Sequence, residues 1–133
     1  MIKIEHLGIA VNSVTESVKL FEALLNTACY KTELVESEGV NTAFFKTGDT
    51  KIELLEGTNP DSPISKFIAK KGEGIHHIAF EVADIQAEIH RLKESGFAIL
   101  NEVPKPGADN KLVCFLHPKS TNGVLIELCQ EKK

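Results

Sequence analysis

A short apolar stretch led by a histidine occurs twice in this chain of 133 residues, and this repeat constrains the fold more than any other feature. Residues 6–11 read HLGIAV, and residues 77–82 read HIAFEV, 71 positions later. The tripeptide IEL at residues 52–54 returns at residues 126–128, 74 positions later. Two matches in the same order at nearly the same offset predict a duplicated module that opens with a histidine strand and closes with a glutamate strand.

The segments between these landmarks agree in type. In the first half, Ser13 opens a capping box before apolar residues at helical spacing; in the second, Asp84 can cap a helix that stops at Gly96. Short strands follow each helix, with turn residues between them, and are predicted at residues 34–36, 42–47 and 51–55 and at residues 97–100, 112–116 and 124–129. We therefore predict an α+β fold in which two tandem βαβββ modules form a curved, barrel-like mixed sheet with helices outside.

The length favours one domain, residues 1–133, which can bury a core without help from a structural metal. We predict module 1 over residues 1–57 and module 2 over residues 75–131. The connector between them, residues 58–74, contains a short helix that Ser62 caps, Pro63 starts and Gly72 ends.

Side chains alternate between the two faces of a strand, so the adjacent histidines His76 and His77 point to opposite faces. The repeat matches His77 to His6, and both then lie on the face that carries a small residue two positions later. Glu53 and Glu127 each stand between apolar neighbours that point to the other face. If the modules form one site, two histidines and two glutamates converge there.

Two nitrogen and two oxygen donors suit a divalent first-row metal ion: Co²⁺, Mn²⁺, Ni²⁺, Fe²⁺ or Zn²⁺. Four protein ligands on an octahedral ion leave two positions for substrate oxygens, which would stabilise the enolate that forms when an α-proton is lost. Taken singly, His6 could be structural, and Lys51 could pair with Glu53 across an exposed face. Duplication of the whole set favours the metal site. Of the other histidines, we interpret His76 as structural, His90 as solvated and His117 as a turn residue, with a substrate contact as the alternative for His117.

Composition excludes several classes of function. The net charge is -4 and Arg91 is the only arginine, which argues against nucleic acid as a partner. The three cysteines lack a CxxC spacing and are expected to be reduced, small buried hydrophobes. No long apolar run or basic-then-apolar leader is present, so we expect no membrane contact and a cytoplasmic location.

Several longer motifs resemble a known family. They are HLGIAV at 6–11, KIELL at 51–55, DSPI at 61–64, GIHHIA at 74–79, FLHPK at 115–119 and GVLIEL at 123–128. With the duplicated βαβββ unit, they resemble the vicinal oxygen chelate (glyoxalase) superfamily and, within it, the methylmalonyl-CoA epimerase family. The resemblance runs nearly end to end.

This resemblance implies a metal-dependent epimerase that interconverts (R)- and (S)-methylmalonyl-CoA through a metal-stabilised enolate, an acyl-CoA substrate and a homodimer. It places the metal ligands at His6, His77 and Glu127, with a fourth at Glu53. Inversion needs two bases. Glu127 is one, while some relatives carry the other as a glutamate where this chain has Thr42. Glu53, Glu38 or a metal-bound water are then candidates for the second proton carrier.

Two alternatives share the fold. A glyoxalase I-type lactoylglutathione lyase would need the same proton transfer, with the loops of residues 104–119 shaped for a tripeptide. A non-catalytic ligand-binding protein would be expected to have lost the metal donors, whereas all four are present here. Lys105, Lys111 and Lys119, which fall in or beside the second-half loops, could neutralise an anionic substrate.

Overall fold

A computed structural model describes residues 1–132 and divides the chain into two compact units. The first-half unit contains residues 6–76, and the second-half unit contains residues 1–5 together with the chain from residue 77 onward. None of the described helices is long and apolar enough to span a membrane.

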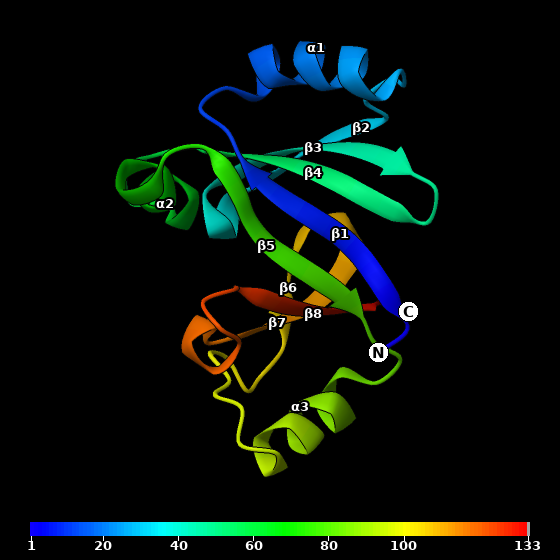
Figure 1. Ribbon diagram of the computed structural model, residues 1–133, viewed down its shortest axis with the longest axis vertical. Coiled ribbons are helices and arrows are strands. Elements are labelled where there is room, and N and C mark those ends of the chain that lie inside the picture. Colours follow the sequence, from blue (N-terminus) through cyan, green and yellow to red (C-terminus); the bar gives the residue numbers. More distant parts are fainter. Residues whose placement is uncertain (133) are drawn as a thin grey trace. The chain divides into compact units, whose positions relative to one another are not determined.

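The first-half unit is a four-stranded mixed sheet with two helices (Figure 1). Its elements are β1 (Lys3–Ala10, from residue 6), α1 (Val14–Leu25), β2 (Lys31–Val35), the 3-10 turn η1 (Glu36–Glu38), β3 (Val40–Thr47), β4 (Thr50–Gly57) and α2 (Pro63–Lys71). The strand order is β2-β3-β4-β1, in which β2, β3 and β4 are antiparallel and β1 runs parallel to β4.

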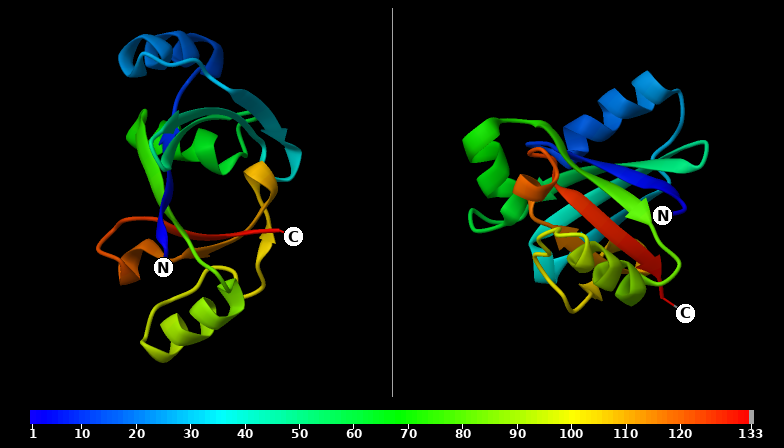
Figure 2. Two further views of the ribbon diagram at one scale, coloured as in Figure 1. Left: turned by 90° about the vertical axis from the view of Figure 1, so that its right-hand side faces the viewer. Right: turned by 60° about the horizontal axis from the view of Figure 1, so that its bottom comes forward.

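Helix α1 covers one face of this sheet. Its N-cap is Ser13, whose hydroxyl oxygen accepts a hydrogen bond from the Glu16 amide at 3.2 Å, as the capping box predicts. Val14 then packs into a buried cluster with Phe45 and Leu54. In the views of Figures 1 and 2, α1 lies on one side of the strands, which leaves the opposite face for polar chemistry.

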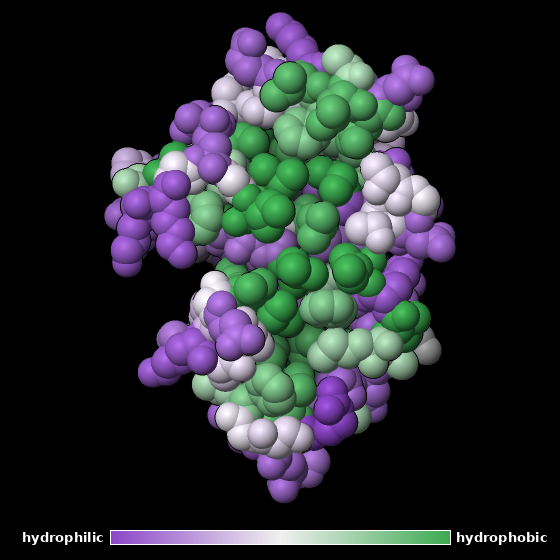
Figure 3. Space-filling model, viewed as in Figure 1, coloured by the Kyte–Doolittle hydropathy of each residue, from purple (hydrophilic) through white to green (hydrophobic). Residues whose placement is uncertain are grey.

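The outer side of α1 is partly apolar. Leu20 and Leu24, one helical turn apart, are both exposed, and Figure 3 shows hydrophobic surface over this helix. Scattered exposed leucines are ordinary on a protein surface. The apolar contacts between α1 and the sheet come from its inner side, which includes Val14, Val18 and Phe21.

The second-half unit repeats this topology. Its elements are β5 (Gly74–Glu81, from residue 77), α3 (Ile85–Glu94), β6 (Lys105–Pro106), the 3-10 turn η2 (Ala108–Asn110), β7 (Lys111–Leu116), the 3-10 turn η3 (Pro118–Ser120) and β8 (Ile126–Glu131). The order β5-β8-β7-β6 has β5 parallel to β8 and antiparallel pairs elsewhere. Strand for strand this is the arrangement β1-β4-β3-β2, which supports the duplication predicted from the sequence.

One predicted strand is wrong. Residues 97–100 form only an isolated bridge between Ile99 and Leu116. The strand that pairs with β7 on the side away from β8 is the two-residue β6, which lies inside a predicted loop. The Asn101 side chain explains the difference. Its Nδ2 donates to the Val113 carbonyl at 3.2 Å and its Oδ1 accepts from the Phe115 amide at 2.9 Å, so the side chain takes backbone groups that a paired strand would use.

The connector helix follows the prediction. Ser62 caps α2, its hydroxyl oxygen accepting from the Ile64 amide at 3.3 Å, with Pro63 in the first turn. Gly72 ends the helix at φ +82, a backbone conformation that favours glycine. Ile64 packs with Leu55 and Ala10, which anchors α2 within the first-half unit.

Candidate metal centre and active site

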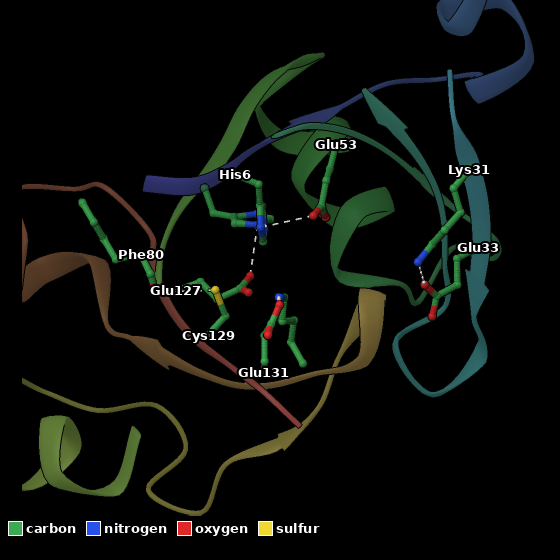
Figure 4. Close-up of polar contacts among 10 residues, drawn as sticks. His6, Lys31, Glu33, Glu53, Phe80, Glu127, Cys129 and Glu131 are labelled. Carbon is green, nitrogen blue, oxygen red and sulfur yellow. Dashed lines mark hydrogen bonds and ion pairs between the residues drawn. The ribbon is translucent and has the colours of Figure 1, made fainter. Parts of the chain in front are cut away.

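His6 and Glu53 form a buried pair in the first-half unit, on the face of the sheet opposite α1. In the parallel pairing of β1 with β4, Gly8 lies opposite Glu53 and His6 lies opposite Lys51. Because Gly8 has no side chain, the His6 ring can reach diagonally to the carboxylate: His6 Nδ1 and Glu53 Oε2 are 3.1 Å apart (Figure 4). Both side chains are buried, so each needs a polar partner.

His77 and Glu127 form an equivalent pair in the second-half unit. Ala79 lies opposite Glu127 in the parallel pairing of β5 with β8, and His77 Nε2 is 3.1 Å from Glu127 Oε1. The edge of the His77 ring also meets the ring of Phe115, with 6.0 Å between their centroids. In both units the histidine therefore contacts a glutamate of the neighbouring strand. That glutamate lies opposite the small residue two positions after the histidine, Gly8 or Ala79.

Each pair has a spacing that suits metal ligation. Two adjacent ligands, each bonded at about 2.1 Å to one ion, lie about 3 Å apart. The nitrogen and oxygen of each pair are separated by 3.1 Å, so either pair can supply two neighbouring ligands without rearrangement. Imidazole nitrogen and carboxylate oxygen are also the donors that first-row divalent ions accept. The residues present thus fit a divalent metal ion.

Lys111, one of the three lysines considered for an anionic substrate, is buried, which the sequence did not predict. It begins β7, directly after the loop, is only 4% exposed, and its Nζ is 3.1 Å from Glu131 Oε1. The β7–β8 register places Lys111 opposite Glu131 and Phe115 opposite Glu127, so Lys111 and Glu127 share a face. Alternation with Val113 and Phe115 predicts that Lys111 lies on their face of the strand, but only if β7 is extended to begin at Lys111.

The other predicted lysines differ in setting. Lys105, in β6, places its ammonium 5.9 Å from the centre of the Phe115 ring, near enough for a cation–π attraction. Lys119 lies in η3 and is exposed. Lys105 therefore lies against Phe115, which is the cross-strand neighbour of Glu127, and Lys111 shares a face with Glu127.

The sequence did not predict the burial of three further polar residues. Glu5 and Thr42 are almost fully buried, and Ser62 is buried as the α2 cap. Thr42 lies in β3 opposite Glu33 of β2. Glu38, considered above as a proton carrier, lies in η1 at the end of β2. Of these residues, Glu5 is the one that the sequence analysis did not single out.

The remaining histidines behave as predicted. His76 packs edge-on against Phe67 of α2, with 4.9 Å between ring centroids. His90 is 79% exposed and lies 3.8 Å from Glu94, one turn along α3. His117 caps η3, its Nδ1 accepting from the Lys119 amide at 3.1 Å. The exposed position of His90 and the turn position of His117 are thereby confirmed, and the contact with Phe67 supports a structural role for His76.

All three cysteines are free thiols. Cys114 and Cys129 are fully buried, as predicted, while Cys29 is partly buried. Burial, and to a smaller extent the negative charge of Glu127, raise the pKa of the Cys114 thiol to about 11. Cys114 packs in the apolar cluster beneath α3 and remains a neutral thiol near neutral pH.

Comparison with known families agrees with this architecture. Residues 5–115 match the model of the Glyoxalase/Bleomycin resistance protein/Dioxygenase superfamily. The chain therefore belongs to this superfamily, and the predicted fold class is confirmed.

Individual relatives narrow the assignment. A hypothetical protein from Bacillus halodurans has a solved structure with 45% identity and a TM-score of 0.96, covering 98% of this chain and 95% of that one. The ethylmalonyl-CoA/methylmalonyl-CoA epimerase of Cereibacter sphaeroides is 40% identical over 96% of this chain and 97% of its own length. A Streptomyces coelicolor methylmalonyl-CoA epimerase variant bound to 2-nitronate-propionyl-CoA has 36% identity and a TM-score of 0.92, covering 98% and 95%. The resemblance to the methylmalonyl-CoA epimerases is therefore confirmed.

Proposed function

We propose that this chain is a metal-dependent epimerase that interconverts (R)- and (S)-methylmalonyl-CoA. The observation that carries the proposal is the duplicated His–Glu pair, held in the same register in both units with the same 3.1 Å separation. Relatives named as methylmalonyl-CoA epimerases, matched over nearly the whole chain, indicate the substrate. The name of the Cereibacter relative adds ethylmalonyl-CoA as a second compound to test.

We propose that His6, Glu53, His77 and Glu127 bind one divalent metal ion. When bound, such an ion polarises the thioester and carboxylate oxygens of the substrate and stabilises the negative charge of an enolate. The histidines, held against the glutamates, fix the direction of their ring nitrogens. Co²⁺, Mn²⁺, Ni²⁺, Fe²⁺ and Zn²⁺ all accept this donor set.

Glu127 removes the proton from C2 of the substrate in this proposal. Its carboxylate is buried and lies on the same face as the Lys111 ammonium, which suits an anionic acyl group. Breaking the C2–H bond gives a planar enolate and a protonated Glu127. Protonation on the opposite face then inverts C2, and protonation on the same face restores it.

The test follows the C2 proton. Protein loaded with each metal in turn is incubated with either epimer of methylmalonyl-CoA in D₂O, and deuterium uptake and inversion are measured. We expect both, with loss of both after chelation and recovery when the metal is returned. No uptake with any of the five ions would refute the proposal. The hemithioacetal of methylglyoxal and glutathione would then test the glyoxalase alternative.

The predicted cytoplasmic location and homodimer belong to the same proposal. Sedimentation of the purified chain at several concentrations measures the assembly state, with a dimer as the expected result. Fractionation of the source cells, followed by detection of the chain, measures its location.

A further inference from the structure

We propose that Lys105 binds the free carboxylate of the malonyl group and thereby selects malonyl-type thioesters over thioesters without a second carboxyl group. This inference rests on the proposed function and names a specificity residue for it. The carboxyl carbon of a methylmalonyl group is bonded directly to C2. A cation that binds this carboxylate must therefore lie beside the base that removes the C2 proton, which is Glu127 in the proposed reaction.

The strand register places Lys105 on the face of the second-half unit that carries Glu127. Lys105 of β6 lies opposite Val113 of β7. Phe115, two residues further along β7, lies opposite Glu127 of β8. Residues two apart on a strand project to the same side of a sheet, and so do residues opposite each other in an antiparallel pair. The ammonium and the carboxylate therefore share one face within this unit.

The ring of Phe115 lies between the ammonium and the proposed base. Lys105 Nζ is 5.9 Å from the centre of this ring. The edge of the His77 ring meets the same ring, with 6.0 Å between centroids, and His77 Nε2 is 3.1 Å from Glu127 Oε1. An acyl group beside Phe115 can thus place its carboxylate on the ammonium and its C2 against Glu127.

Solvent reaches this part of the face. Lys105 and Phe115 are both half-buried, so each keeps exposed surface that a ligand can contact. His77 and Glu127 are buried beside them, at 6% exposure each. The accessible surface of Lys105 and Phe115 is therefore the side from which a substrate approaches this pair.

Lys111 lies on the same face but is less suited to direct contact. Its Nζ is 3.1 Å from Glu131 Oε1, so its charge already has a partner. The row that contains Lys111 is separated from the row of Glu127 by the buried pair of Val113 and Cys129. Figure 4 shows Glu127, Cys129 and Glu131 on one side of β8. Lys111 therefore acts on the site through its charge at longer range.

The segment that carries Lys105 is held closely against β7. The Gly107 amide donates to the Lys111 carbonyl at 2.9 Å, and a Cβ on Gly107 would lie 2.9 Å from Val113 Cγ1. Glycine permits this approach because it has no side chain. The backbone at Lys105 is therefore fixed relative to β7, which lowers the cost of ordering the ammonium for a ligand.

A cation at this place also offsets a repulsion. The Glu127 carboxylate and the free carboxylate of the substrate are both negative, and they repel each other in a site that excludes water. The ammonium of Lys105 can pair with the substrate carboxylate through a charge-assisted hydrogen bond. Binding of the anionic acyl group beside an anionic base then becomes favourable.

Steady-state kinetics of substituted variants test the assignment. Lys105→Met keeps an unbranched apolar side chain without the charge, and we expect KM for methylmalonyl-CoA to rise about 10-fold to 100-fold while kcat changes less than about threefold. Lys105→Arg keeps the charge and should recover most of this affinity. Lys119→Met, at an exposed position in η3, is the matched control and should behave as wild type. An unchanged KM in Lys105→Met, or a loss confined to kcat, would overturn the assignment.

Binding calorimetry identifies the anionic group that Lys105 contacts. The ligands are racemic methylmalonyl-CoA, whose epimerisation causes no net change, propionyl-CoA, which lacks the free carboxylate, and racemic methylmalonyl-pantetheine, which lacks the phosphates. Lys105→Met should weaken binding of both methylmalonyl compounds about 10-fold to 100-fold, and binding of propionyl-CoA less than about twofold. Weaker binding of the two CoA thioesters, with no change for the pantetheine compound, would assign Lys105 to a phosphate and overturn the proposal.

Further measurements separate a lost contact from a lost fold. Lys105→Met should keep the native circular dichroism spectrum and the wild-type metal affinity, because Lys105 is not among the proposed metal ligands. Lys105→Gln, which keeps a polar end, provides the same comparison if Lys105→Met does not fold. Equal weakening of all three ligands in a folded variant would overturn the proposal. Failure of wild type to exchange the C2 proton would instead refute the proposed function, whereas the binding comparison needs no turnover and tests Lys105 by itself.

Discussion

Replacement of His6 by alanine tests whether the His–Glu pairs bind a metal ion or serve only to stabilise the fold. In metal-free protein, His6→Ala removes a buried contact to a carboxylate at 3.1 Å, which costs about 1.5–3 kcal/mol of unfolding free energy. The cycle of His6→Ala, Glu53→Gln and the double variant should give a coupling energy between about 0.5 and 3 kcal/mol.

The metal-linked part of stability is the more informative quantity. A ligand at 100 times its dissociation constant adds about 2.7 kcal/mol to the unfolding free energy. For a chain of this length that corresponds to a rise in Tm of about 10 °C. If His6→Ala weakens affinity a hundredfold, the same metal concentration adds only about 0.4 kcal/mol, a rise of about 1–2 °C.

Scanning calorimetry with and without metal measures this rise. His76→Ala is the matched control, because His76 packs on Phe67 and is expected to leave the metal-linked rise intact while lowering the baseline Tm. Full retention of the rise in His6→Ala would refute our reasoning. Equal losses in the two variants would do the same, because strand alternation places only one of these histidines with the glutamates.

Three further predictions concern the second-half unit. Glu127→Ala should abolish turnover and retain the native circular dichroism spectrum, because the backbone pairing of β5 with β8 does not depend on this side chain; a fully active variant would remove Glu127 as the base. Above pH 9, the unfolded chain loses the Cys114 proton that the folded chain keeps until about pH 11, so stability should fall as pH rises, by about 2–3 kcal/mol in total. Cys114→Ala should flatten this loss in denaturant titrations, and an unchanged slope would contradict the assigned pKa. Lys111→Met should lower kcat/KM for the acyl-CoA by about 10-fold to 100-fold through loss of a buried cation, whereas the exposed Lys119→Met should have little effect.

Alternation and repetition determined much of the candidate site from the sequence. Both histidines of the pairs follow from the repeat, and the parity of a strand selects His77 over His76. The caps at Ser13, Ser62 and Asp84 were also predictable, because each depends on side chains within three residues of the helix start. Such features are local, so neighbouring residues suffice to define them.

Only the tertiary structure decided how the strands align. Gly8 lies opposite Glu53 and Ala79 lies opposite Glu127, although the two repeats differ in spacing by three residues. The side chain of Asn101 displaces a predicted strand by occupying backbone groups of β7, a contact that no periodicity encodes.

The same holds for the candidate residues beyond the repeat. Burial of Lys111 and its placement on the same face as Glu127 depend on register between strands. Register is set by hydrogen bonds and packing between segments distant along the chain, and a shift of one residue would turn each side chain to the other face. The sequence by itself therefore determined which residue types are available for the chemistry, while the pairing of strands decided which of them share a face.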